Sequence, residues 1–103
     1  MKNKADFTGF IAEMKVDPAT GNGTIRAESH ADKLVHRCRV DFNTNTSFYR
    51  WNGKESLPIS YKEVQFQDKI RVWFVTPSAD AYPEEGLAKK VIVATGLPLD
   101  IVN

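Results

Sequence analysis

Apolar and polar residues alternate one by one along several segments of this chain, and this pattern limits its possible folds more than any other feature. In residues 23–28, Gly, Ile and Ala alternate with Thr, Arg and Glu. In residues 34–42, Leu, His, Cys, Val and Phe alternate with Val, Arg, Arg and Asp. A period of two places successive side chains on opposite faces of a strand. The two segments therefore predict neighbouring β-strands joined by a short turn at residues 29–32.

Three further segments complete the predicted set of strands. Residues 7–16 carry apolar side chains on both faces, and Gly9 inside them permits a bend at which the buried face changes. Residues 17–23 contain Asp, Pro, Gly and Asn, which favour a hairpin turn. Residues 69–75 are rich in β-branched and aromatic residues, and residues 88–94 are apolar on both faces, so each segment predicts a strand.

The alternating pattern is lost between Asn43 and Gln67, where only one local feature predicts structure. Ser60 and Glu63 have the spacing of a capping box, in which the serine oxygen accepts from a first-turn amide and the glutamate reaches back. We therefore expect a single short helical turn near residues 61–64.

Five short strands and one helical turn predict a small all-β barrel, because a closed barrel leaves no strand edge exposed. The architecture that fits best is a five-stranded OB-like Greek-key barrel. An SH3-like barrel has the same number of strands and remains the alternative, since only the connection between the third and fourth strands separates the two. The long excursion over residues 43–67 favours the OB-like form.

Length, composition and charge agree with one globular domain spanning residues 1–103. Hydrophobic residues make up 42% and charged residues 26%, and 14 basic residues stand against 13 acidic ones, for a net charge of +1. Such a balance offers no overall attraction to nucleic acid or to an anionic membrane. The basic N-terminus lacks the apolar stretch of a signal peptide, and no segment has the roughly 20 apolar residues that cross a bilayer. We expect the chain as given to be a soluble monomer.

The residues that carry catalytic or metal chemistry elsewhere lack their usual companions here. Cys38 and His36 share one strand face, yet no further ligands stand at zinc-site spacing, so we expect them to point inward with Leu34, Val40 and Phe42. Ser29 and His30 lack a nucleophile elbow and an orienting carboxylate. Residues 21–24 lack the pattern of a phosphate-binding loop. We expect no metal, no cofactor and no enzymatic activity.

The strongest functional candidates are surface residues on the predicted strands: Arg26, Arg37, Arg39, Arg71 and Trp73. In an OB-like barrel the second and third strands form the usual ligand face, where basic side chains follow phosphates and aromatic rings stack on bases or sugars. Glu28 and Asp41 share that face, so an ordinary mixed-charge surface with cross-strand ion pairs is the alternative interpretation.

Two segments outside the predicted strands add aromatic candidates. Phe48, Tyr49 and Trp51 surround an arginine, and such a group either anchors a partner or packs as a lid over one end of the barrel. Tyr82 precedes Pro83 and is either a further contact or part of a rigid turn.

Three short motifs resemble the YobA-like proteins of bacilli: Gly9-Phe10-Ile11, the segment 68–74 (Asp-Lys-Ile-Arg-Val-Trp-Phe), and Tyr82-Pro83 followed by residues 88–91 (Ala-Lys-Lys-Val). This resemblance implies an OB-like domain that is exported or lipid-anchored, in a family of unknown function without known catalytic residues. The chain departs from the family pattern at Gln67, where Gly is preferred, and in its longer excursion over residues 43–59.

We therefore predict a non-catalytic binding or interaction module. By resemblance it acts outside the cytoplasm, with a protein or a cell-envelope component as its partner. The alternative is an OB-fold protein that binds single-stranded nucleic acid through its basic strand face, which the low net charge makes the weaker hypothesis.

Overall fold

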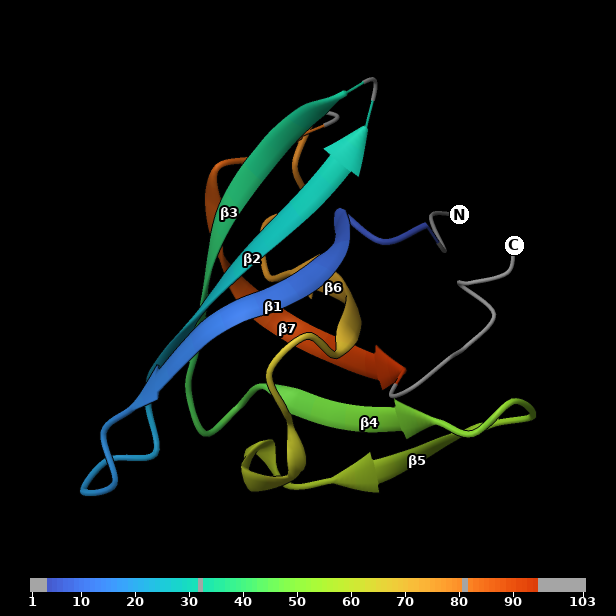
Figure 1. The fold of residues 1–103 in the computed structure, drawn as a ribbon. Coiled ribbons are helices and arrows are strands. Elements are labelled where there is room, and N and C mark those ends of the chain that lie inside the picture. The colour runs from blue at the N-terminus through green and yellow to red at the C-terminus, as the bar shows by residue number, and fades with distance from the viewer. Residues whose placement is uncertain (1–3, 32, 81, 95–103) are drawn as a thin grey trace.

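The computed structural model describes residues 4–31, 33–80 and 82–94 of the chain. They form seven β-strands and one 3-10 helix, η1 (Figure 1). In chain order these elements are β1 (Phe7–Val16), β2 (Gly23–Ala31), β3 (Leu34–Phe42), β4 (Ser47–Trp51), β5 (Ser56–Ile59), η1 (Tyr61–Glu63), β6 (Lys69–Phe74) and β7 (Glu85–Ala94). The protein is all-β, as its alternating pattern predicts.

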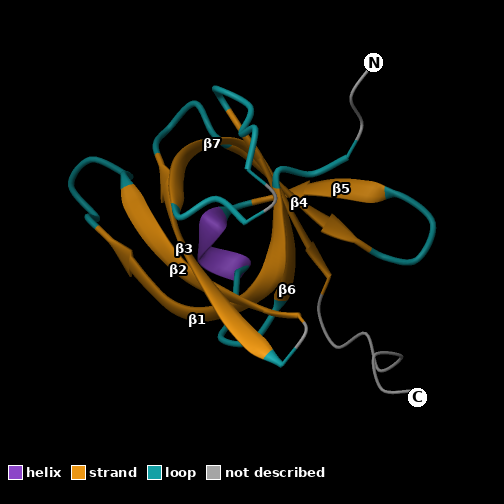
Figure 2. Cartoon of the chain, turned by 90° about the horizontal axis from the view of Figure 1, so that it is seen from above, coloured by secondary structure: helices purple, strands orange, loops and turns teal. Residues whose placement is uncertain are grey.

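Five of the strands close into a barrel in the order β1, β2, β3, β7, β6 and back to β1. Every pair is antiparallel except β3 with β7, which closes the ring through three parallel register pairs, from Arg39 with Glu85 to Asp41 with Leu87. Figure 2 looks down this ring and shows η1 across its far end. The prediction of a small five-stranded OB-like barrel is confirmed, and η1 lies in the connection between the third and fourth barrel strands.

The excursion over residues 43–67 contains two strands, β4 and β5, that the sequence did not predict. β4 pairs in parallel with β7 from Ser47 opposite Lys90 to Arg50 opposite Val93, directly beyond the stretch that β7 shares with β3. Among the described strands β5 pairs with β4 alone, so the two form a hairpin that extends the sheet outside the barrel. The predicted helical turn is confirmed by its capping box, in which Ser60 Oγ accepts from the Lys62 amide and Glu63 Oε2 accepts from the Ser60 amide.

The hairpin of β2 and β3 is longer than predicted. Ser29 and His30, expected in a turn, lie within β2, and the register continues to the pair Ala31 and Leu34. β7 reaches only residues 39–41 of β3, so the tip of the hairpin extends beyond the barrel. Leu34, predicted to face inward, is therefore 59% exposed.

Inward side chains of all five barrel strands build the core. The inward phase of the predicted strands places six residues together in the core: Ile25, Val40, Ile70, Val72, Phe74 and Ile92. The first five are at most 3% exposed. The prediction for Ile92 is wrong, because it lies half-buried on the outer face while Val91 and Val93 point inward. β7 is apolar on both faces, so its residues do not reveal which set faces the core.

The buried face of β1 does change, but not at Gly9 as predicted: Phe7, Gly9 and Ile11 all face inward, and the change follows Ile11, where the register with β2 shifts before Glu13. Gly9 instead lies where β1 comes closest to β2. A Cβ atom at this position would collide with the backbone carbonyl of Glu28 on β2. Only glycine permits this close approach of the two strands. Along its other edge β1 pairs with β6, and Gly9 lies opposite Ile70 in that register.

Candidate interaction surface

The structure separates the predicted surface residues into four places. Three arginines lie on β2 and β3: Arg26, Arg37 and Arg39. Four residues lie on the outer face of β4 and β6: Tyr49, Trp51, Arg71 and Trp73. Phe48 is in the core, and Tyr82 lies in the loop before β7.

The arginines of β2 and β3, which we call the arginine face, are each matched with a carboxylate. Arg26 Nη1 lies 3.1 Å from Glu13 Oε1, and Arg37 Nε lies 3.4 Å from Glu28 Oε2. Arg39 has two partners, Glu85 at 3.0 Å and Asp41 at 3.4 Å. The three arginines, with Glu13 and Glu28, help to line a pocket of about 880 Å³ on the barrel surface. A phosphate entering it would have to compete with carboxylates already in place, which agrees with the interpretation of a mixed-charge sheet.

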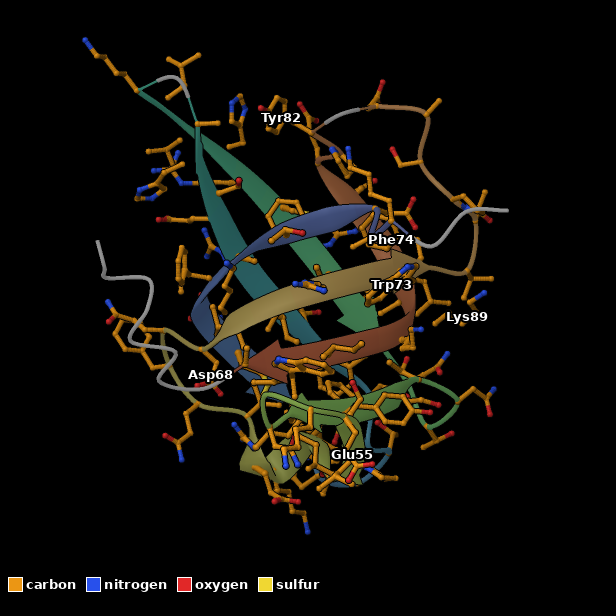
Figure 3. All side chains as sticks on the ribbon, turned by 90° about the vertical axis from the view of Figure 1, so that its right-hand side faces the viewer. Glu55, Asp68, Trp73, Phe74, Tyr82 and Lys89 are labelled. Carbon is orange, nitrogen blue, oxygen red and sulfur yellow. The ribbon has the colours of Figure 1, made fainter. Side chains whose placement is uncertain are left out.

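The outer face of β6, β7 and β4 has a different character, and Figure 3 views it from the front, with Trp73 and Lys89 labelled. The strand register places Arg71 beside Ile92 and Ile92 beside Tyr49, in one row across three strands. We call this surface the aromatic face and define it by Tyr49, Trp51, Lys69, Arg71, Trp73, Lys90 and Ile92. Trp51, at the edge of this surface, is 40% exposed.

The basic residues of the aromatic face differ from the paired arginines of the arginine face. Among the described residues, no carboxylate lies within 4.0 Å of the charged groups of Lys69, Arg71 or Lys90. Lys90 instead places its Nζ 4.3 Å from the ring centroid of Trp73, its register partner on β6. Such a cation–π contact orders both side chains without neutralising the charge.

Phe48 packs over one end of the barrel, which is the second of the two roles considered for its segment. It is 7% exposed and packs edge-on against Phe42, with ring centroids 5.2 Å apart. Tyr61 of η1 also packs against Phe42, with ring centroids 5.7 Å apart. Phe48 is therefore part of the packing at this end of the barrel and does not belong to the contact surface, because its ring is covered.

Tyr82 is held against β3. Its ring stacks on that of His36 with centroids 3.7 Å apart and an interplanar angle of 7°. Nearby, the Arg39 amide donates to the carbonyl of Glu84 at 2.8 Å. These contacts fix the loop on the barrel and agree with the rigid-turn interpretation, although 43% of Tyr82 is exposed.

The one cysteine is not placed for nucleophilic chemistry. Cys38 is 2% exposed, and its burial, with smaller contributions from Glu85 and Asp41, raises the pKa of the thiol to about 12. The thiolate is the reactive and metal-binding form, so it is scarce at neutral pH. In the part of the chain that the structure describes, no group of three or more His, Cys, Asp or Glu residues is arranged to hold a metal ion.

Several residues of the aromatic face were not among the sequence candidates. Lys90 and Ile92 belong to β7, whose outward set became identifiable only when Val91 and Val93 were seen to point inward. Phe10, which borders the aromatic face, was not a candidate either: it is 40% exposed and lies beside Lys69 in the register of β1 and β6. Its alternation with buried Ile11 could have revealed it as an outward aromatic residue.

A search against protein-family models finds no match to this chain, and comparisons with curated proteins and with solved structures find none either. None of the helical segments described could cross a membrane, since the helix present is a single short turn. What the protein does is therefore argued from its surface chemistry, because a barrel of this kind hosts many unrelated functions.

Proposed function

We propose that this protein is a non-catalytic binding module whose partner is a protein or another component of the cell envelope. The observation that carries the proposal is the contrast between its two charged faces. On the arginine face each arginine is ion-paired with a carboxylate of the protein. On the aromatic face Lys69, Arg71 and Lys90 lie near Tyr49 and Trp51 and have no acidic partner within the described part of the chain. Aromatic residues and arginine are the types most often found at the energetic centres of interfaces.

The resemblance to YobA-like proteins supports an envelope partner. Two of the three resembling motifs coincide with the strands of the aromatic face, since residues 68–74 cover β6 and residues 88–91 lie in β7. The family resemblance therefore concerns the surface that the charge pattern singles out. In our proposal the protein acts outside the cytoplasm, and the barrel serves as a rigid support for this face.

The second candidate function is binding of single-stranded nucleic acid on the arginine face. It is favoured by the pocket of about 880 Å³ that Arg26, Arg37 and Arg39 help to line on the second and third barrel strands. The ion pairs of all three arginines weigh against it, because a phosphate gains little where a carboxylate must first be displaced.

Site-directed photo-crosslinking in intact bacterial cells tests the proposed contact surface. Tyr49 is replaced by a photoreactive phenylalanine analogue, and the same analogue at Tyr82 is the matched control on another surface. We expect irradiation to give a discrete adduct with an envelope protein, lipid or polymer from position 49 and none from position 82. An adduct from position 82 alone would overturn the assignment of the surface, and the absence of any adduct would count against a binding module.

A further inference from the structure

The charges of the aromatic face are spaced for a surface rather than for a single small anion. Lys69 and Arg71 are two residues apart on β6, which separates their backbones by about 7 Å. Arg71 and Lys90 are diagonal neighbours on β6 and β7, again about 7–8 Å apart. Three cations therefore spread over the face, and none has a carboxylate at ion-pair distance among the residues that the structure describes.

Amphipathic and apolar side chains fill the space between these cations. Both tryptophans of the chain, Trp51 and Trp73, lie on this face, together with Tyr49 and Ile92. Phe10 adds an exposed ring beside Lys69. Tryptophan and tyrosine have an apolar body and a polar atom, and they gather at the boundary between membrane and water.

From this combination we propose that the aromatic face docks on a membrane surface that carries anionic phospholipids. The inference rests on the proposed function and names its partner. The cations would lie among the headgroup phosphates, and the rings would enter the interfacial layer. The net charge of +1 does not oppose this, because salt limits the attraction to about 8–10 Å and only the local face counts.

The same features fit a single-stranded nucleic acid less well. Base stacking needs free ring faces along a positively charged groove. One face of the Trp73 ring is already covered by Lys90, and Trp73 is half-buried. Ile92 lies between Arg71 and Tyr49 in the row across the strands, where a phosphate chain would need a polar contact.

Vesicle binding tests the inference, and intrinsic fluorescence reports it directly because both tryptophans are on the face. The probes are vesicles of phosphatidylglycerol and phosphatidylcholine in equal amounts, and vesicles of phosphatidylcholine alone. We expect co-sedimentation with the anionic vesicles only, a shift of tryptophan emission to shorter wavelength, and loss of binding at high salt. Equal binding to both vesicles, or binding without an emission shift, would overturn the inference.

A matched pair of variants locates the surface. Replacing Lys69 and Arg71 by Gln is expected to weaken vesicle binding about 25-fold, since each basic side chain near an anionic surface contributes roughly a factor of five. Replacing Lys15 and Lys33 by Gln removes the same charge from outside the face and should leave binding unchanged. Equal losses in both variants would show a nonspecific charge effect and overturn the site. Circular dichroism and thermal unfolding establish that each variant is folded.

Two further probes decide between partners. Tighter binding of a labelled oligothymidylate than of vesicles, lost on replacing Lys69 and Arg71, would replace the membrane with nucleic acid. The same result with poly-glutamate would replace it with an acidic protein surface. If the protein does not bind vesicles but position 49 still crosslinks to an envelope protein, the membrane inference is wrong and the proposed function stands. If neither vesicle binding nor a crosslink is observed, the membrane inference and the proposed function are both wrong.

Discussion

Lys90 lies over the ring of Trp73, with its Nζ 4.3 Å from the ring centroid, and so joins β7 to β6 on the outer face of the barrel. The two residues are register partners, and a shift in the pairing between Trp73 and Phe74 follows directly after them. The contact holds one ring and one charge in fixed positions beside Arg71 and Ile92. It therefore helps to order the aromatic face before any partner arrives.

Lys90→Ala should remove this contact and lower the free energy of unfolding by about 0.5–1 kcal/mol, the usual value of an exposed cation–π pair. In a Trp51→Phe background the remaining emission comes from Trp73, so the variant should also change the fluorescence of the folded protein. Lys89→Ala, at the exposed neighbouring position, is the control and should change neither quantity. Identical spectra for the two variants would contradict the contact.

Most of the barrel could be predicted because its strands bury one face and expose the other. Ile70, Val72 and Phe74 alternate with outward Lys69, Arg71 and Trp73, so the pattern specifies both the strand and its orientation. The capping box at Ser60 is equally local, since both of its hydrogen bonds span at most three residues. Such features depend little on the rest of the chain.

The hairpin of β4 and β5 and the inward set of β7 could not be predicted, because these strands lack a clear alternation of buried and exposed residues. β4 carries aromatic residues on both faces, and β5 contains Pro58, which is unfavourable in central strands. The hairpin joins the sheet through the pairing of β4 with β7, which begins more than 30 residues after the end of β4. The aromatic face could not be predicted for the same reason, because Lys90, Ile92 and Tyr49 come together through the pairing of β7 with its neighbours.

Val72→Ala should lower the free energy of unfolding by about 2 kcal/mol or more, through lost burial and a residual cavity. Val72 is fully buried between β1 and β7, whereas Val75, just after β6, is 56% exposed. The same substitution at Val75 is the control and should cost less than about 0.5 kcal/mol. Urea unfolding measures both, and a loss below about half a kcal/mol for Val72→Ala would contradict its place in the core.

Adjacent residues of β4 should respond in opposite ways. Phe48→Ala is expected to lower the free energy of unfolding by about 3 kcal/mol or more, because the ring is buried against Phe42. Tyr49→Ala should cost less than about 1 kcal/mol, since this side chain lies on the aromatic face. It should instead weaken binding to anionic vesicles. A larger stability loss at Tyr49 than at Phe48 would reverse the assigned faces of β4.

Ionisation of the Cys38 thiol should lower the free energy of unfolding only at high pH. The ordinary pKa of a cysteine thiol is 9.0, and burial raises the pKa of Cys38 to about 12 in the folded protein. The fold therefore favours the protonated thiol, so this contribution is fully present below pH 9 and is lost as the pH rises toward 12.

Comparing the wild type with Cys38→Ala isolates the contribution of the thiol from every other effect of pH. The wild type should lose more stability than the variant between pH 9 and 11 in urea unfolding. A thiol reagent at pH 8 should modify the folded wild type far more slowly than the urea-unfolded chain. Equal modification rates in the folded and unfolded states would show that the thiol is neither buried nor protonated.

Single-stranded DNA should bind weakly at physiological salt, no tighter than the roughly 10⁻⁴ to 10⁻⁶ M of nonspecific association. The reason is specific to the arginine face, where Glu13 and Glu28 already occupy Arg26 and Arg37 at 3.1 and 3.4 Å. Replacing both glutamates by Gln should therefore free two guanidinium groups and tighten binding on the order of tenfold at low salt. A fluorescence-anisotropy titration with a labelled oligothymidylate measures the change. Submicromolar affinity of the unmodified protein, lost on Arg37→Glu while the fold persists, would instead show that phosphates displace these carboxylates and would make nucleic-acid binding the leading function.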